Sequence, residues 1–440
     1  MDKVITIKPT VLLMAPVNTR SGYGARSRDI AHALIDMDKY DVMIWPTKWG
    51  NTPMNALDSN NERDKRLIDR ILVSPNLPSQ PDIFIQVTVP NEFQRIGRFN
   101  IGITAGIETT IASAPWIEGC NRMDLILVSS QHSKNVLQGS GWVKHDSNTH
   151  QPMGEIKLEK PIEVLFEGVD LTKYFKTPNR PQSIDAKMEG VSESFCFLFT
   201  GHWLAGDLGE DRKNISGLIR TFLDAFKNVP SHKRPALILK TSSADFSKID
   251  RELMISKINQ IRDLVGGNLP SIYLLHGDLT DEEMNGLYNH PKIKAHITFT
   301  KGEGFGRPLA EASLSEKPII ASNWSGHLDF IKDAVLLPGQ LTKVHPSAAW
   351  KDVILEESQW MTVDYGYAVR VLKSFVDEYG KDMKKMGANQ ASYVRDNFSL
   401  ESMGRLLDKL LDQYAPPMPK QVKLNLPKLK KIGELNETNV

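Results

Sequence analysis

Short apolar runs alternate along most of the chain with segments whose apolar residues recur at helical spacing. In the first part of the chain, the runs that predict strands span residues 10–15, 40–45, 83–87, 100–105, 125–128 and 163–166. The helical patterns between them span residues 25–35, 61–72 and 131–138. Alternating strands and helices favour a parallel sheet covered by helices on both faces. This part is therefore predicted to be a doubly wound α/β domain, with a polar surface loop at residues 144–160.

A polar stretch with prolines at residues 177–193 separates this pattern from a second one and is predicted to be a linker. Beyond it, the predicted strands span residues 195–200, 236–240, 272–275, 295–300 and 318–321. The predicted helices span residues 215–226, 250–265, 281–289 and 308–316. The same argument predicts a second doubly wound domain.

The end of the chain differs from both domains. Helical patterns at residues 364–376, 379–398 and 402–414 follow one another without strands between them, and the last residues are rich in proline and lysine. We expect that tail to be extended and mobile. It is either a solvated end or a contact for an anionic acceptor or membrane. The chain thus divides into an N-terminal domain (1–180), a C-terminal domain (190–398), a final helix (399–415) and a basic tail (416–440).

Composition limits the classes of protein. The 440 residues include 54 Lys and Arg against 53 Asp and Glu, a net charge of +1, so no global field attracts nucleic acid. Two cysteines exclude a disulfide framework and fit a reducing compartment. No apolar run approaches the roughly 20 residues of a membrane span, and residues 1–9 lack the apolar core of a signal peptide. We expect a cytoplasmic protein without an integral membrane segment.

Two glutamates, Glu303 and Glu311, stand eight positions apart around a glycine-rich turn. Glu303 should lie at the carboxyl end of a strand, and Glu311 about one turn into the next helix. Ligands bind at this edge of open α/β sheets. Ionised carboxylates only accept hydrogen bonds, which suits a ligand rich in hydroxyl groups. Gly304 and Gly306 let backbone amides approach such a ligand closely.

Four further segments accompany this motif. They are Ser21-Gly22-Tyr23-Gly24, residues 164–170, Asp211-Arg212-Lys213-Asn214 and residues 322–331. Taken with the two glutamates, the chain resembles the retaining GT-B glycosyltransferases of the family 4 type. The resemblance implies two Rossmann-like domains with a cleft between them and final helices that cross back onto the N-terminal domain. It also implies transfer of a sugar, with retention, from a nucleoside diphosphate sugar to an acceptor hydroxyl.

Breaking the donor bond leaves charge on the departing diphosphate, which fixed donors must stabilise. Arg212 and Lys213 precede a predicted helix, whose N-terminus adds partial positive charge, and so suit this role. The resemblance assigns Glu311 to the ribose hydroxyls of the nucleotide and Glu303 to the hydroxyls of the donor sugar. It places the amides of Gly304, Phe305 and Gly306 near the sugar and phosphate.

The chain departs from the family at two positions. His202 stands where the family commonly has a phosphate-binding arginine, and we expect Arg212 to take over that role. Glu108 stands where many members have a histidine near the sugar. It is a candidate for positioning, for a base or for a nucleophile, and we favour positioning. Gly22, Tyr23 and Gly24 are expected to form a tight turn whose amides hold a phosphate, although a plain turn explains them as well.

No cofactor or metal is expected, because Arg212 and Lys213 supply the charge that diphosphate departure requires. The donor's base and sugar and the oligomeric state are not readable. The acceptor is a glycan, a lipid-linked sugar, a small molecule or a modified nucleic acid. Two other functions fit the same fold. One is a sugar phosphorylase or synthase, and the other is a nucleotide-sugar-binding protein without transferase activity.

Overall fold

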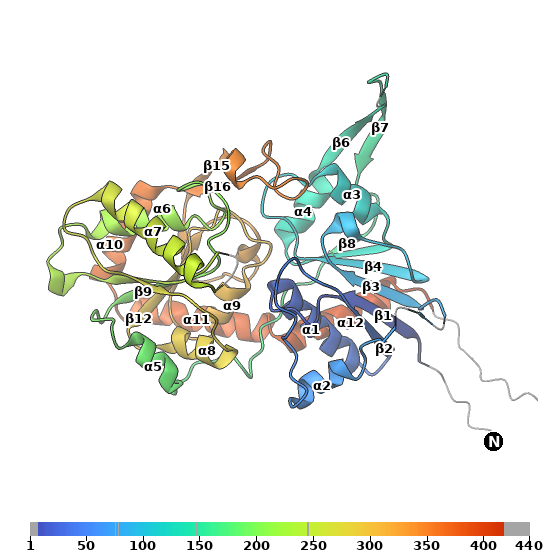
Figure 1. Cartoon of the computed structure of the whole chain (residues 1–440), viewed down its shortest axis with the longest axis horizontal. Coiled ribbons are helices and arrows are strands. Elements are labelled where there is room, and N and C mark those ends of the chain that lie inside the picture. Colours follow the sequence, from blue (N-terminus) through green and yellow to red (C-terminus); the bar gives the residue numbers. More distant parts are fainter. Residues whose placement is uncertain (1–7, 75, 78, 147, 244–245, 418–440) are drawn as a thin grey trace, which may run out of the picture.

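The computed structural model describes residues 8–417, except residues 75, 78, 147 and 244–245. Two lobes lie side by side, and each is built around a six-stranded parallel sheet (Figure 1). The prediction of two doubly wound domains is confirmed. Apart from its first two residues, the predicted tail at 416–440 lies outside the described residues. None of the helices in the described part is long and apolar enough to cross a membrane.

The N-terminal sheet has the strand order β2-β1-β3-β4-β5-β8. Its strands are β1 (Thr10–Ala15), β2 (Asp41–Pro46), β3 (Ile83–Val87), β4 (Phe99–Thr104), β5 (Leu125–Val128) and β8 (Ile162–Val164). Its helices are α1 (Gly22–Asp36), α2 (Glu62–Ile68), η1 (Pro90–Glu92), α3 (Ala114–Asn121) and α4 (Gln131–Gly139). One apolar core joins α1 to one face of the sheet, and a second joins α3 and α4 to the other face. Strands buried on both faces read as continuous apolar runs, which is why the pattern located them well.

The loop predicted at residues 144–160 is wrong. Two antiparallel strands, β6 (Gly141–His145) and β7 (Pro152–Lys157), form a hairpin that projects from the N-terminal lobe (Figure 1). Nearly all of its residues are exposed or half-buried. Main-chain pairing rather than burial of an apolar face holds the hairpin together, so it leaves no hydrophobic pattern in the sequence.

The C-terminal sheet has the strand order β11-β10-β9-β12-β13-β14. Its strands are β9 (Cys196–Thr200), β10 (Ala236–Lys240), β11 (Ile272–Leu275), β12 (Ile293–Ile297), β13 (Ile319–Ser322) and β14 (Val335–Leu337). The helices around it are α5 (Gln182–Met188), α6 (Ile215–Phe226), α7 (Lys248–Val265), α8 (Asp281–Asn289), α9 (Arg307–Ser313), α10 (Tyr365–Asp377) and α11 (Lys381–Asn397). Helices α6, α7 and α10 share a core with one face, and α5, α8, α9 and α11 lie toward the other. Residues 177–193 are therefore not simply a linker, because α5 buries Ile184 and Met188 one turn apart.

A second hairpin was also missed. Strands β15 (Gly339–Lys343) and β16 (Gln359–Val363) pair antiparallel beside the C-terminal sheet, and the chain between them extends toward the N-terminal lobe (Figure 1). Gln359 exchanges two hydrogen bonds with Thr110, both 2.9 Å long, and the Ser113 hydroxyl donates to the Asp352 carbonyl at 2.8 Å. The hairpin therefore spans the space between the domains on one side of the molecule.

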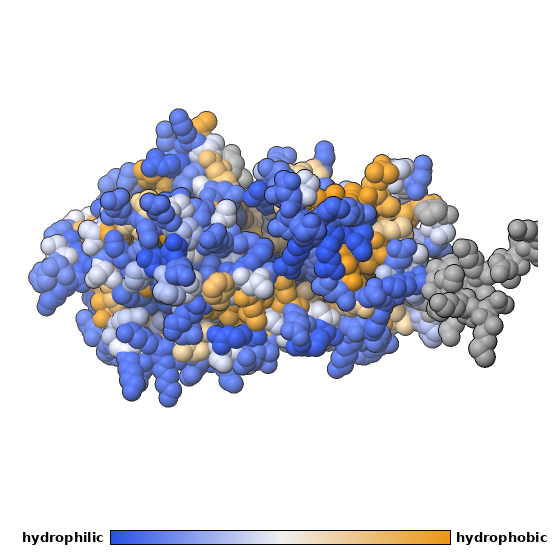
Figure 2. Space-filling model, turned by 90° about the horizontal axis from the view of Figure 1, so that it is seen from below, coloured by the Kyte–Doolittle hydropathy of each residue, from blue (hydrophilic) through white to orange (hydrophobic). Residues whose placement is uncertain are grey.

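The last described helix, α12 (Leu400–Tyr414), packs against α1 of the other lobe. Its buried Met403, Leu407, Leu410 and Leu411 belong to the N-terminal core. Hydrophilic residues cover most of the face seen in Figure 2. Both cysteines, Cys120 and Cys196, are free and buried.

Candidate active site

The glycine-rich segment lies in the loop between β12 and α9, and it touches the N-terminal domain. A Cβ atom on Gly302 would lie 1.9 Å from the Glu108 carbonyl oxygen, and one on Gly304 would lie 2.2 Å from the Ala105 carbonyl oxygen. Glycine is needed at both positions because the main chain of the other domain approaches so closely. The sequence analysis explained Gly304 only by the close approach of a ligand. The structure adds the close approach of the Ala105 main chain as a second explanation. The contact brings Glu108 next to Glu303.

Four charged side chains meet where the loops of the two domains touch. Lys213 forms an ion pair with Glu303, and Arg212 Nη1 lies 3.3 Å from Glu303 Oε2. The same Nη1 atom donates to the Gly302 carbonyl at 2.8 Å and lies 3.8 Å from Glu108 Oε1. The structure thus brings together the four residues predicted to be catalytic.

Glu303 is ionised in this cluster. Its residue is 8% exposed, and burial alone would raise its pKa. The adjacent charges of Lys213 and Arg212 outweigh burial and lower the pKa of Glu303 to about 2. Burial lowers the pKa of Lys213, while Glu303 opposes that shift. Glu303 therefore pairs with both cations, and Glu108 lies near Arg212 as a second carboxylate.

Arg212 and Lys213 are held at the start of α6 by a tight turn. Asn214, the residue before the helix, has the left-handed conformation with φ of 52°. The Asp211 carboxylate accepts a hydrogen bond from the Ile215 amide at 3.2 Å, and the Tyr365 hydroxyl donates to Asn214 Oδ1 at 3.0 Å. These bonds fix the turn, so that both cations lie at the positive end of the helix, as the sequence predicted.

Glu311 lies in the second turn of α9 and is held by an arginine of its own helix. Arg307 Nε donates to Glu311 Oε1 at 2.9 Å, and Arg307 Nη1 donates to Asp29 Oδ2 at 2.6 Å. Asp29 belongs to α1, so this chain of contacts also joins the two domains. Burial raises the pKa of Glu311 to about 7, although Arg307 opposes the shift. Sequence reasoning missed Asp29 and left Arg307 without a role, because their partners are distant in the chain.

The predicted tight turn at Gly22, Tyr23 and Gly24 is wrong, since these residues form the first turn of α1. Ser21 caps the helix, and its hydroxyl oxygen accepts from the Gly24 amide at 2.9 Å. That amide is therefore already bonded. The Tyr23 hydroxyl accepts from the Ala105 amide at 3.1 Å and so supports the loop that touches Gly304. The signal for this arrangement was the serine before the glycines, which is a strong N-cap residue.

The other predicted residues lie on the same edge of the C-terminal sheet but differ in environment. His202 follows β9, is exposed, and places Nδ1 3.2 Å from the Ser242 hydroxyl at the end of β10. Phe305 is buried, and its ring packs 4.9 Å from that of Phe330 in the domain core. Gly306, with φ of 97°, is the left-handed residue before α9. The side chain of Phe305 thus anchors the loop.

Little open space lies directly against the cluster on the side of α9. A cavity of about 30 Å³ is lined by residues that include Lys213, Glu303 and Gly306. That volume holds about one water molecule. Within the described part of the chain, no group of three or more His, Cys, Asp or Glu side chains is arranged to hold a metal ion.

Comparisons with known proteins bear on the fold. No protein-family model matches the sequence, and no curated protein is significantly similar to it in sequence. Several solved structures are similar. Sucrose-phosphate synthase from Thermosynechococcus elongatus has a TM-score of 0.60 at 12% identity, and the match covers 92% of this chain and 99% of that one. HepE from Anabaena, in complex with UDP-glucose, has a TM-score of 0.56 at 14% identity over 92% of this chain and 99% of that one.

Trehalose-6-phosphate synthase OtsA has a TM-score of 0.56 at 13% identity, and the match covers 93% of this chain and 100% of that one. The similarity thus extends over both domains, while the sequences have diverged far. The chain has the GT-B fold of these glycosyltransferase structures, with two Rossmann-like domains.

Proposed function

We propose that the protein is a retaining glycosyltransferase of the family 4 type that uses a nucleoside diphosphate sugar. The observation that carries the proposal is the cluster of Arg212, Lys213, Glu303 and Glu108 at the meeting point of the two domains. Two partly buried cations at a helix N-terminus suit a diphosphate, and two carboxylates beside them suit sugar hydroxyls.

In this proposal Glu303 changes partner when the donor binds. Without donor, its carboxylate pairs with Lys213 and Arg212. The oxygens of a diphosphate compete for the same two cations, and they gain charge as the glycosidic bond breaks. Glu303 is then free to accept hydrogen bonds from the donor sugar.

The transfer itself needs no protein nucleophile. The bond from the sugar's anomeric carbon to the diphosphate oxygen breaks, and the acceptor oxygen bonds to that carbon on the same face. The proton of the acceptor hydroxyl goes to the departing phosphate oxygen. Glu108 faces the Arg212 guanidinium at 3.8 Å, an arrangement that suits a positioning group.

Glu311 is proposed to bind the ribose hydroxyls, since a carboxylate accepts hydrogen bonds from both members of a vicinal diol. Arg307 occupies one of its oxygens, Oε1. UDP is the nucleotide to test first, because the similar HepE structures were solved in complex with UDP and with UDP-glucose.

A thermal-shift screen with UDP, GDP, ADP, TDP and CDP and their common sugars tests the proposal. A nucleotide at about 100 times its Kd adds roughly 2.7 kcal/mol to the unfolding free energy. The shift should appear with one base and disappear in Lys213→Ala and Glu311→Ala. Lys157→Ala is the matched control, since Lys157 pairs with Glu155 on the exposed β6–β7 hairpin. Absence of a shift with every nucleotide would overturn the proposal.

A further inference from the structure

A large pocket lies beside the charged cluster, under the β15–β16 hairpin, and the proposed function assigns it no role. Its volume is about 850 Å³. This is the size of pockets that enclose small organic ligands, roughly 300–1,000 Å³. Its lining comes from the loop before Arg212, from Lys301, from the hairpin and the chain between its strands, and from the start of α10.

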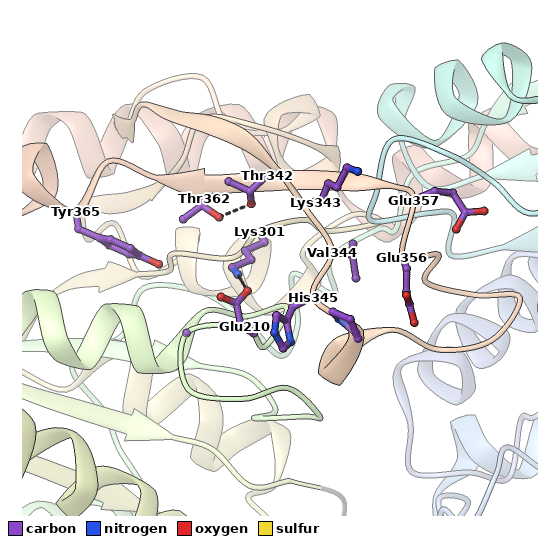
Figure 3. A pocket seen from close by; sticks show the side chains of 12 residues that line it. Glu210, Lys301, Thr342, Lys343, Val344, His345, Glu356, Glu357, Thr362 and Tyr365 are labelled. Atoms are coloured by element: carbon purple, nitrogen blue, oxygen red, sulfur yellow. Dashed lines mark hydrogen bonds and ion pairs between the residues drawn. The ribbon is translucent and has the colours of Figure 1, made fainter.

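A nearly buried lysine stands at the centre of this pocket. The Lys301 side chain is 2% exposed, its Nζ lies 3.1 Å from Glu210 Oε2, and it sits 5.2 Å from the centre of the Trp360 ring. Figure 3 shows Lys301 and Glu210 in the middle, with the Thr342–Thr362 pair on the hairpin beside them. These groups offer fixed hydrogen-bond donors and acceptors together.

Two further carboxylates of the pocket lie at its edge. Glu356 and Glu357 lie toward the N-terminal domain in Figure 3. Among the described residues, neither carboxylate has a hydrogen bond or ion pair, and the Lys343 ammonium has none either. The ring of Tyr365, which is 36% exposed, offers an apolar face at the other end.

The charges of the lining indicate the class of ligand. Two lysines and three glutamates line the pocket, a small excess of negative charge that disfavours an anionic ligand. Hydroxyl groups both donate and accept, so a ligand with many of them satisfies carboxylates, ammonium groups and threonines together. A neutral saccharide has these hydroxyls, and its C–H faces pack on an aromatic ring.

The pocket and the charged cluster are built from the same segments. The Lys301 amide donates to the Arg212 carbonyl at 2.7 Å, and Met361 on the hairpin donates to the Lys301 carbonyl at 3.0 Å. The hairpin also binds Thr110, two residues after Glu108. A ligand held here therefore lies next to the residues that the proposed function assigns to transfer.

We propose that the pocket under the β15–β16 hairpin binds the neutral saccharide portion of the acceptor. This inference rests on the proposed function for naming the ligand an acceptor. It predicts that the protein extends an uncharged glycan rather than a phosphorylated or uronic-acid sugar.

A printed array of neutral, uronic-acid-containing and phosphorylated glycans tests the proposal, with the full chain applied in the presence of the nucleotide identified by thermal shift. Neutral glycans should be retained. Thr342→Trp fills the pocket and should weaken their binding by about tenfold or more. Leu341→Trp is the matched control, because Leu341 is 47% exposed, neighbours Thr342 on the same strand and does not line the pocket. A retained glycan, incubated with donor, should gain the mass of one sugar.

Four results would overturn the inference while nucleotide binding persists. They are retention of acidic glycans only, retention of no glycan, equal binding by both tryptophan variants, and binding of a glycan that never gains mass. Loss of the nucleotide shift in the wild-type chain is a different result, because it overturns the proposed function itself.

Discussion

Beside the Glu303–Glu311 motif, the C-terminal domain contributes arginines and the N-terminal domain contributes carboxylates to the ion pairs between the domains. On the C-terminal side, Arg212 and Arg307 each hold a carboxylate of their own domain, Glu303 and Glu311. On the N-terminal side, Glu108 and Asp29 each meet one of these arginines, at 3.8 Å and 2.6 Å. Each glutamate of the motif is therefore linked through an arginine to the opposite domain. The C-terminal domain therefore supplies the charges proposed to bind the donor. The N-terminal domain supplies carboxylates that pair with two of these charges and favour contact between the domains.

The largest effect on activity should come from a substitution in the C-terminal domain. Lys213→Ala removes a donor to the departing diphosphate and should lower kcat by about 10²–10³-fold. Release of the nucleoside diphosphate from the donor found in the thermal-shift screen measures this. Lys240→Ala, on the same edge of the sheet with Nζ bonded to the Gly277 carbonyl at 2.7 Å, is the matched control. Equal losses in both variants would contradict a specific role for Lys213.

The two ion pairs that Arg212 and Arg307 form with the N-terminal domain should differ in strength. The Arg307–Asp29 pair is shorter than the Arg212–Glu108 pair, and Asp29 is 13% exposed against 25% for Glu108. Breaking a fully buried pair costs about 3–5 kcal/mol, and a surface pair contributes about 1 kcal/mol or less. The Arg307–Asp29 pair lies between these limits and nearer the first than the Arg212–Glu108 pair does.

Asp29→Ala should therefore open the domains more than Glu108→Gln. Small-angle X-ray scattering should report the larger radius of gyration for Asp29→Ala, together with a lower urea midpoint. A larger opening in Glu108→Gln would reverse the ranking of the two links.

The contact of the glycine-rich loop with the N-terminal domain can be tested separately from charge. Gly304→Ala places a methyl group 2.2 Å from the Ala105 carbonyl, and overpacking of this kind costs about 1–3 kcal/mol. Gly22→Ala is the control, since no atom lies within 4 Å of a Cβ there. Denaturant unfolding should show the loss for Gly304→Ala only. An unchanged midpoint would mean that the loops separate readily.

The smallest effect should be a pH dependence that belongs to Glu311. Its pKa of about 7 means that its ionised fraction, and with it ribose binding, falls about tenfold between pH 8 and pH 6. Isothermal titration of the nucleotide at both pH values should show this change in the wild-type chain. In Glu311→Gln, only the titration of the nucleotide phosphate should still change the affinity, and the part of the pH dependence that comes from Glu311 should disappear. The same pH dependence of nucleotide affinity in the wild-type chain and in Glu311→Gln would contradict the proposal that Glu311 binds the ribose.

The same shifts set the pH dependence of stability in opposite directions. A raised pKa means that folded Glu311 holds its proton more tightly than the unfolded chain, so its contribution becomes less favourable as pH rises from about 4.5 to 7. Glu303, with a lowered pKa, contributes stability that is lost as pH falls from about 4.5 toward 2. The two glutamates of one motif are thus predicted to titrate apart.

The sequence predicted the strands of the two parallel sheets better than it predicted the hairpins or the pairing of charged residues. Strands β3, β5 and β10 have the predicted bounds, because strands buried on two faces are continuous apolar runs. Neither hairpin was predicted, since their residues are mostly polar and their stability comes from main-chain pairing. The pairing of Asp29 with Arg307 was out of reach as well, because nothing local links residues 278 positions apart.

The sequence by itself determined two doubly wound domains, the position of Glu303 after a strand and of Glu311 in the helix that follows, and the cations at the start of α6. Those features depend on periodicity, turn residues and capping, which act over a few neighbouring residues. Only the tertiary structure decided that the Ala105 main chain packs against Gly304, that Arg307 pairs with Asp29, and that a pocket lies under the β15–β16 hairpin. Close packing between segments far apart in the chain produces these features, and no local pattern encodes it.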